Sequence, residues 1–287
     1  MKKEKRKKTN EKGKLLKRSL LAASAVVVIG ATTAAAQSSD YFSLFFDQEA
    51  KGIVEHQSSN HVSKVVSGIE MAVEETIISG KSALIIVTFE KEDGTAFSSD
   101  IVIPTLELDW EQNVGFMVEQ KMTEDRKKLI AMFDVDSTTN MDGEKMTITA
   151  DRLLEEGTDQ VIANGPLQIS FEASENPTSK HVNTNIQLAQ SNETLTLQTI
   201  YVSANGIGIE GTYLDGKNDE LPDYSPEVII TTLDHNNIEL KLGSTSTTES
   251  GFKWQYNLDE TGERLLLNSD NIKSVMIDGH TIEVSPE

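Results

Sequence analysis

Hydrophobic and polar residues alternate along most of the chain after residue 60, and this period of two predicts β-strands. Ile69, Met71 and Val73 alternate with more polar neighbours, so we expect them to face a core. Residues 83–89 are almost continuously apolar, which is typical of a strand in the middle of a sheet. Lys127–Val135 fits a helix or a strand, and its neighbours favour a strand.

The same reasoning predicts many short strands separated by turn residues. In the first half they cover residues 69–73, 83–89, 101–108, 114–118, 127–135, 146–150 and 167–171; in the second half they cover 195–202, 207–213, 228–232, 238–242, 252–258, 265–267 and 274–284. Asp278-Gly279 between alternating runs is the strongest hairpin signal, and Glu92–Thr95 is expected to close another hairpin. Residues 152–165 are expected to form a polar connection with one helical turn.

Short strands without long helical repeats are typical of β-sandwiches. Residues 172–185 are polar, contain Pro177 and lack apolar periodicity, so we predict a linker there. The fold class is therefore mainly β, with two β-sandwich (immunoglobulin-like) domains at 41–171 and 186–287. Two similar stretches, one beginning at Gly68 and one at Glu193, share the order strand, Ser/Gly turn, strand and Asp-Gly turn, which indicates either duplication or generic β grammar.

Residues 19–36 form an apolar segment preceded by a basic tail. Residues 1–18 contain ten Lys or Arg and two Glu, whereas the remaining chain has sixteen basic and forty-four acidic residues. Eighteen residues span about 27 Å as a helix, close to the thickness of the hydrocarbon core of a bilayer, which is about 30 Å. Basic residues next to such a segment stay on the cytoplasmic side. The segment is either a transmembrane anchor or a signal peptide cleaved after Ala36. The aromatic stretch 40–46 that follows is either an interfacial anchor or a short helix packed on the first domain.

Composition narrows the function classes. The chain has no cysteine and a net charge of −20. The stability of an exported protein without disulfides depends on its hydrophobic cores. Such a protein is more typical of a bacterial cell surface than of an animal secretory route. The acidity argues against nucleic acid as a partner, because phosphates would repel it.

No catalytic, cofactor-binding or metal-binding residues are predicted, and no cofactor. His56 and His61 lack a third ligand, and the stretch from Asp134 to Glu144 does not match the spacing of a calcium loop. The better interpretation of that stretch is a turn rich in Asp and Asn. Trp110 and Trp254 are expected in a core or at its rim.

One family resemblance emerges from these strands. Residues 42–97 resemble an extracytoplasmic module of unknown function found in anti-sigma-factor-like membrane proteins of Gram-positive bacteria, with Gly68, Val73, Glu75 and Phe89 at the pattern positions. Residues 165–171 resemble the closing strand of that module, and residues 183–287 resemble the immunoglobulin-like domain that often follows it. The chain departs from full anti-sigma relatives in having only eighteen residues before the anchor.

The resemblance implies a non-enzymatic envelope sensor or regulator, held in the cell membrane through residues 19–36 with its C-terminal domains outside the cell. Its expected partner is an envelope protein or the cell wall. The alternative is a secreted or wall-associated structural or adhesive protein.

Overall fold

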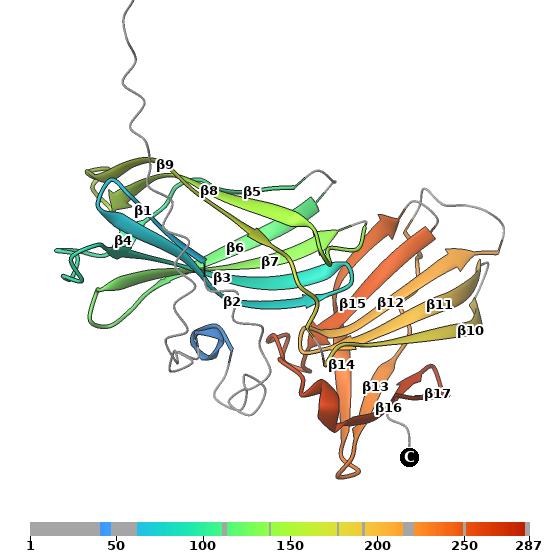
Figure 1. Cartoon of the computed structure of the whole chain (residues 1–287). Helices are drawn as coiled ribbons and strands as arrows, with labels where there is room; N and C mark the ends of the chain where they lie inside the picture. The colour runs from blue at the N-terminus through green and yellow to red at the C-terminus, as the bar shows by residue number, and fades with distance from the viewer. Residues whose placement is uncertain are drawn as a thin grey trace, which may run out of the picture.

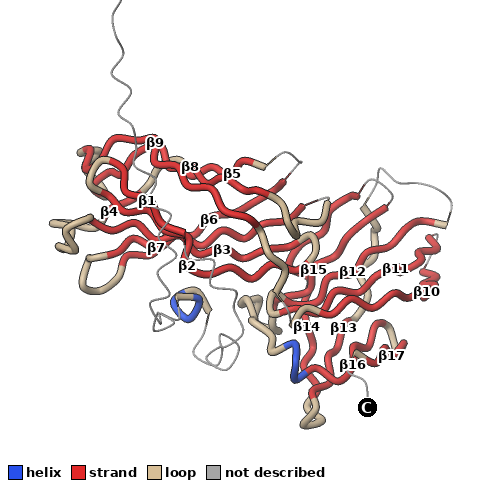
Figure 2. Tube along the Cα trace, in the orientation of Figure 1, coloured by secondary structure: helices blue, strands red, loops and turns tan. Residues whose placement is uncertain are grey.

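The computed structural model describes residues 41–46, 62–110, 114–137, 139–176, 178–190, 193–214, 221–248 and 251–284. These residues form antiparallel β-sheets with two short 3-10 turns, η1 (Phe42–Leu44) and η4 (Ser269–Asn271). Figure 1 shows two β units side by side, with β1 to β9 in one and β10 to β17 in the other, and Figure 2 shows how little of the trace is helical. The mainly β fold class is confirmed.

The N-terminal unit contains two sheets. Sheet A has the order β1 (Val62–Val66), β2 (Ile69–Ser79), β3 (Ser82–Lys91), β7 (Lys128–Ser137) and β6 (Val114–Met122). Sheet B contains β4 (Ile101–Val102), β5 (Leu106–Asp109), β8 (Lys145–Glu155) and β9 (Val161–Glu172), with β8 paired to the other three. Apolar residues of both sheets, including Val73, Phe133 and Ile148, share one buried core.

The C-terminal unit is built in the same way. Sheet C has the order β10 (Lys180–Gln190), β11 (Glu193–Ser203), β12 (Gly206–Tyr213), β15 (Gly251–Leu258) and the second part of β14 (Asn237–Thr248). Sheet D joins the first part of β14 to β13 (Val228–Thr232), β16 (Ile272–Ile277) and β17 (His280–Glu283). Trp254, Phe252 and Ile230 are among the residues of their common core.

The two units have equivalent strand orders. In each unit three consecutive strands form a meander, and the second strand of a later hairpin pairs with the third strand of that meander. The orders are β1-β2-β3-β7-β6 and β10-β11-β12-β15-β14. A bulge lies between Val73 and Glu75 in β2 and at the matching position, between Leu197 and Thr199, in β11. The second sheets also match, since β5-β8-β9 corresponds to β13-β16-β17. This agreement favours an internal duplication over a similarity that unrelated β-strand sequences commonly share.

The pattern of burial explains the continuous apolar run in β3. Ile85 and Val87 face the core between sheets A and B, whereas Leu84 and Ile86 belong to a further cluster on the outer face of sheet A. Both faces of this strand are therefore covered, as the sequence predicts for a central strand. The bulge in β2 inverts the alternation, so that Ile77 joins Leu84 on the outer face.

Several strand predictions are confirmed. Ile69, Met71 and Val73 are buried, residues 128–137 form a strand, and Asp278-Gly279 joins β16 to β17. The chain also turns at His235 and Asn236, between β13 and β14, which begins at Asn237.

Others are wrong. Residues 152–165 belong largely to β8 and β9, which form a hairpin rather than a helical connection. Glu92–Thr95 turns the chain but closes no hairpin, because β3 pairs with β2 and β7. The strand expected at 101–108 is interrupted around Pro104, which has no N–H to donate to a ladder. Residues 265–267 are not a strand.

The connection between the units is shorter than the predicted linker. β10 begins at Lys180, inside the stretch 172–185, and pairs with β11, so the C-terminal unit begins before residue 186. Ala173 and Asn176 are buried, and the Asn176 N–H donates to the Ile78 carbonyl at 2.8 Å. The connection is thus packed against the N-terminal unit.

The basic tail 1–18, the apolar segment 19–36 and the pair His56 and His61 lie outside the described residues. Within the residues that the structure describes, none of the helices has the length and apolar character needed to span a bilayer.

Candidate functional site

Side chains from both units meet along one interface. The β2–β3 turn and the end of β7 in the N-terminal unit face the outer side of sheet C, formed here by β11, β12 and β15 (Figure 1). Gly80 lies so close to Tyr201 that a Cβ at this position would be 2.9 Å from a ring carbon. We call this interface the seam.

Lys253 lies at the centre of the seam. Along β15, Phe252, Trp254 and Tyr256 point into the core of the C-terminal unit, so Lys253 points outward. It is nevertheless only 2% exposed, because the N-terminal unit covers it. Its ammonium forms an ion pair with Asp136 and donates to the Ser82 hydroxyl at 2.8 Å and to the Lys81 carbonyl at 3.1 Å. A buried charge requires such partners.

Two more ion pairs cross the seam. Arg264 Nη2 lies 2.6 Å from Asp134 Oδ2, and Lys81 Nζ lies 2.9 Å from Glu210 Oε1. Burial raises the pKa of the Asp134 carboxyl, and the Arg264 guanidinium only partly opposes that shift. Each of these three carboxylates, in Asp134, Asp136 and Glu210, therefore faces a basic side chain of the other unit.

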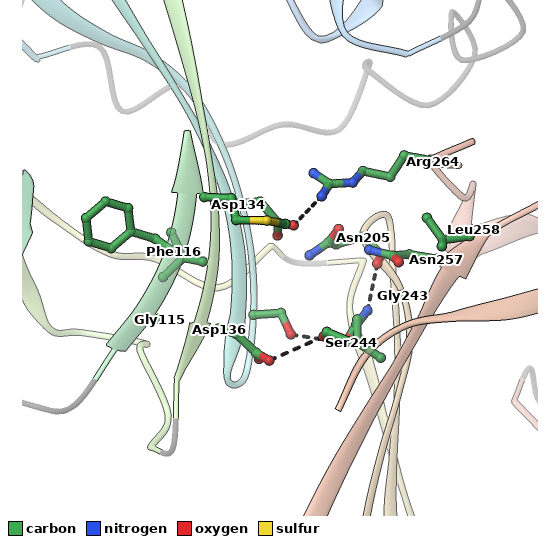
Figure 3. A pocket seen from close by; sticks show the side chains of 14 residues that line it. Gly115, Phe116, Asp134, Asp136, Asn205, Gly243, Ser244, Asn257, Leu258 and Arg264 are labelled. Atoms are coloured by element: carbon green, nitrogen blue, oxygen red, sulfur yellow. Dashed lines mark hydrogen bonds and ion pairs between the residues drawn. The ribbon is translucent and has the colours of Figure 1, made fainter. Parts of the chain in front are cut away.

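A pocket of about 280 Å³ opens along the seam (Figure 3). β6 contributes Gly115, Phe116 and Met117, and β7 contributes Asp134 and Asp136. From the C-terminal unit come Asn205, Gly243, Ser244, Gln255, Asn257, Leu258 and Arg264.

Glycine opens the pocket on the β6 side. Gly115 pairs with Asp136 and Met117 pairs with Asp134, so all four lie on the outer face of sheet A. A Cβ at Gly115 would have its nearest neighbour at 3.9 Å, the Asp136 carbonyl oxygen, so the space beside Asp136 is open.

Two buried amide oxygens, in residues that line the pocket, have no hydrogen-bond partner among the described residues. They are Oδ1 of Asn205 and Oδ1 of Asn257, in residues that are 1% and 4% exposed. Figure 3 shows the two side chains next to each other at the side of the pocket formed by the C-terminal unit. Buried polar atoms are nearly always hydrogen-bonded, so these two oxygens are among the exceptions in the described residues.

The segment Tyr41–Phe46 packs beside the seam. Phe42 and Phe46 are buried in a cluster with Ile77, Leu84, Ile86, Ile130 and Met132 of sheet A and with Ala204 and Leu266 of the C-terminal unit. Lys121 donates to the Leu44 carbonyl at 2.8 Å, and its ammonium lies 5.0 Å from the centre of the Phe45 ring. Of the two alternatives for this aromatic stretch, the structure shows packing on the protein.

The sequence predicts no site residues and no contact of the kind seen at the seam. It places Asp134 and Asp136 in an acidic turn, but they lie in β7 and face the other unit. In the part of the chain that the structure describes, no three His, Cys, Asp or Glu side chains are grouped as metal ligands. Trp254 is a core residue, and Trp110 packs partly buried against the first core.

Comparisons with known proteins add a fold relative. Neither a family model nor a curated protein matches this chain. A solved structure described as the conserved domain protein from Bacillus anthracis is similar, with a TM-score of 0.52 and 11% sequence identity. The match covers 81% of this chain and 79% of that one. At this identity the likeness concerns the fold alone, and it extends across both units.

Proposed function

We propose that this chain is a membrane-anchored, extracytoplasmic binding or sensor protein related to anti-sigma-factor-like regulators. In this proposal residues 1–18 stay in the cytoplasm, residues 19–36 span the membrane, and two immunoglobulin-like β-sandwich units project outward. The units act by binding an envelope protein or cell-wall component and not by catalysis.

The observation that carries the proposal is the position of Tyr41–Phe46. This segment follows the expected anchor by only a few residues, and its two buried rings contact both units. Any change in how the units meet at the seam would therefore also affect the packing of Phe42 and Phe46. A binding event between the units would reach the chain next to the membrane through this cluster.

Electrostatics supports the same proposal. The seam uses polar and charged side chains, which suit an interface that rearranges better than a continuous apolar core does. The apolar cluster around Phe42 lies at its edge. In this proposal the apolar cluster is the rigid contact between the units, and the polar seam is the contact that can rearrange.

The test uses the source bacterium under cell-wall stress. Deletion of the gene should change the transcriptional response to that stress, and Phe42→Ala with Phe46→Ala should change it in the same direction, with the protein still in the membrane. Leu44→Ala is the matched control, because Leu44 is 44% exposed in the same turn.

An unchanged response in the deletion strain would contradict the sensor proposal. Recovery of a mature form beginning at Gln37 from the wall or medium would favour the structural or adhesive alternative.

A further inference from the structure

We propose that Met117 is an oxidation site, at which a peroxide converts the thioether to a sulfoxide that strengthens the contact between the two units. Met117 lies on the outer face of β6, where it lines the pocket in the seam, and it is 64% exposed. Oxidation at this position requires neither the membrane anchor nor an envelope partner, so it goes beyond the proposed sensor role.

The exposure of Met117 sets it apart from the other methionines that the structure describes. Cysteine and methionine carry the sulfur atoms that peroxides oxidise, and the chain has no cysteine. Four methionines are at most 3% exposed, namely Met71, Met132, Met141 and Met146. Met122 and Met276 are half-buried. Among the described methionines, Met117 is therefore the one that a peroxide in the solvent reaches most easily.

The reaction needs only the thioether and the peroxide. A lone pair of the sulfur attacks one peroxide oxygen, the O–O bond breaks, and an S=O bond forms. The other oxygen leaves as water, with the proton of the transferred oxygen. The sulfur loses two electrons and the peroxide gains them, so the balance requires no further reactant. The product is a polar side chain with a strong hydrogen-bond acceptor.

The sulfoxide would lie beside an ion pair that joins the two units. Met117 is directly opposite Asp134 in the β6–β7 ladder, and side chains at such positions interact with each other. Asp134 in turn binds Arg264 of the C-terminal unit, with Nη2 2.6 Å from Oδ2, and all three residues line the pocket (Figure 3). We therefore place the new oxygen within reach of the Arg264 guanidinium.

Electrostatics directs the sulfoxide oxygen to Arg264. This oxygen carries partial negative charge, which the Asp134 carboxylate repels and the guanidinium attracts. A guanidinium has five N–H donors, and Asp134 is the carboxylate that Arg264 binds among the described residues, so donors remain for a second acceptor. Because the side chain of Met117 is largely exposed, its oxidation disrupts no core. Oxidation thus adds a charge-assisted hydrogen bond across the seam.

The first experiment treats the purified full chain in detergent with hydrogen peroxide and follows each methionine by peptide mass spectrometry. We expect Met117 to gain one oxygen, about 16 Da, roughly tenfold faster than the four buried methionines. Met276 is the internal comparison, because it is half-buried on β16 and does not line the pocket. Oxidation of Met276 or of a buried methionine as fast as that of Met117 would overturn the assignment of the site.

The second experiment measures the effect of the sulfoxide on the seam by urea unfolding, followed by circular dichroism. Peroxide treatment limited to Met117 should move the midpoint of the wild type to higher urea. Met117→Leu should lose this shift, and Met276→Leu, the matched control, should keep it. Arg264→Leu should lose the shift although Met117 still gains its oxygen, because the donor is absent.

Met117→Gln keeps the inference testable if Arg264→Leu does not fold. Glutamine supplies an acceptor oxygen without any oxidant, so this variant should unfold at higher urea than Met117→Leu. An unchanged midpoint after oxidation of Met117, or a shift that persists in Arg264→Leu, would show that the sulfoxide does not bind across the seam. Because both experiments use purified protein, their failure alongside an altered stress response in the deletion strain removes the oxidation site but leaves the sensor role standing.

Discussion

The ion pair between Lys253 and Asp136 predicts an asymmetric response to mutation. The two side chains differ in solvent exposure, since that of Lys253 is 2% exposed and that of Asp136 is 30% exposed. Asp136→Ala would leave a buried ammonium without its counter-charge. Removing one partner of a buried pair costs about 3–5 kcal/mol, and we expect this variant to fall in that range.

Lys253→Met should cost less. The carboxylate of Asp136 that remains is partly hydrated and lies 3.4 Å from the Ser244 hydroxyl, and methionine fills much of the space of the lysine stem. Lost hydrogen bonds to Ser82 and Lys81 leave a cost of about 1–3 kcal/mol. The double variant should then be more stable than Asp136→Ala alone, because no charge remains buried.

The measurement is urea unfolding of the full chain in mild detergent, followed by the fluorescence of Trp254, which neighbours Lys253 and is 1% exposed. Lys241→Met is the matched control, because Lys241 and Glu239 form an exposed pair on β14. Exposed pairs contribute about 0–1 kcal/mol. Equal costs for the two single variants, or a double variant less stable than Asp136→Ala, would refute the reasoning.

Three other outcomes are expected. Val73→Asp should destabilise by about 3 kcal/mol or more in the same urea assay through an unpaired buried charge, whereas Val65→Asp, at an exposed site of β1, should change little; equal effects would show that the β2 register is misassigned. Because the folded pKa of Asp134 is raised, its carboxyl disfavours folding above that pKa and this penalty is relieved as the pH falls, so the stability of the wild type relative to Asp134→Asn should rise from neutral pH toward acid; a flat difference would contradict the burial argument. A peptide of residues 1–18 should not capture sigma factors, because ten basic residues favour a solvated tail; a stoichiometric, salt-resistant complex would restore direct sequestration.

Local pattern predicted most strands because each strand needs one buried face. Ile69 and Val73 alternate with more polar residues because one face of their strand is buried. The continuous apolar run in β3 likewise reflects the burial of that strand. The prediction for residues 152–165 is wrong because the polar residues 156–160 at its centre form only the turn of a hairpin. The short apolar runs on either side belong to β8 and β9, and Leu153 and Ala163 lie in the first core.

The seam was beyond sequence reasoning for a different reason. Lys253, Gln255 and Asn257 occupy the polar positions of an alternating strand, and such positions normally face water. These side chains are buried only because the N-terminal unit covers them, and the local sequence pattern carries no information about that contact. Gly115 alone does not indicate a pocket either. The open space beside it exists because its strand neighbour is Asp136 and because the other unit lies opposite.

The matched strand orders of the two units have a consequence for the seam itself. Register places Ile86 and Glu210 at equivalent positions, and likewise Met132 and Lys253. The former of each pair lies in the apolar cluster under Phe42 and the latter lies among the ion pairs. Equivalent positions on the outer faces of sheets A and C therefore carry opposite chemistry, apolar in the N-terminal unit and charged in the C-terminal unit. One and the same strand framework thus supplies the apolar contact for Phe42 and Phe46 on one unit and the ion pairs beside the pocket on the other.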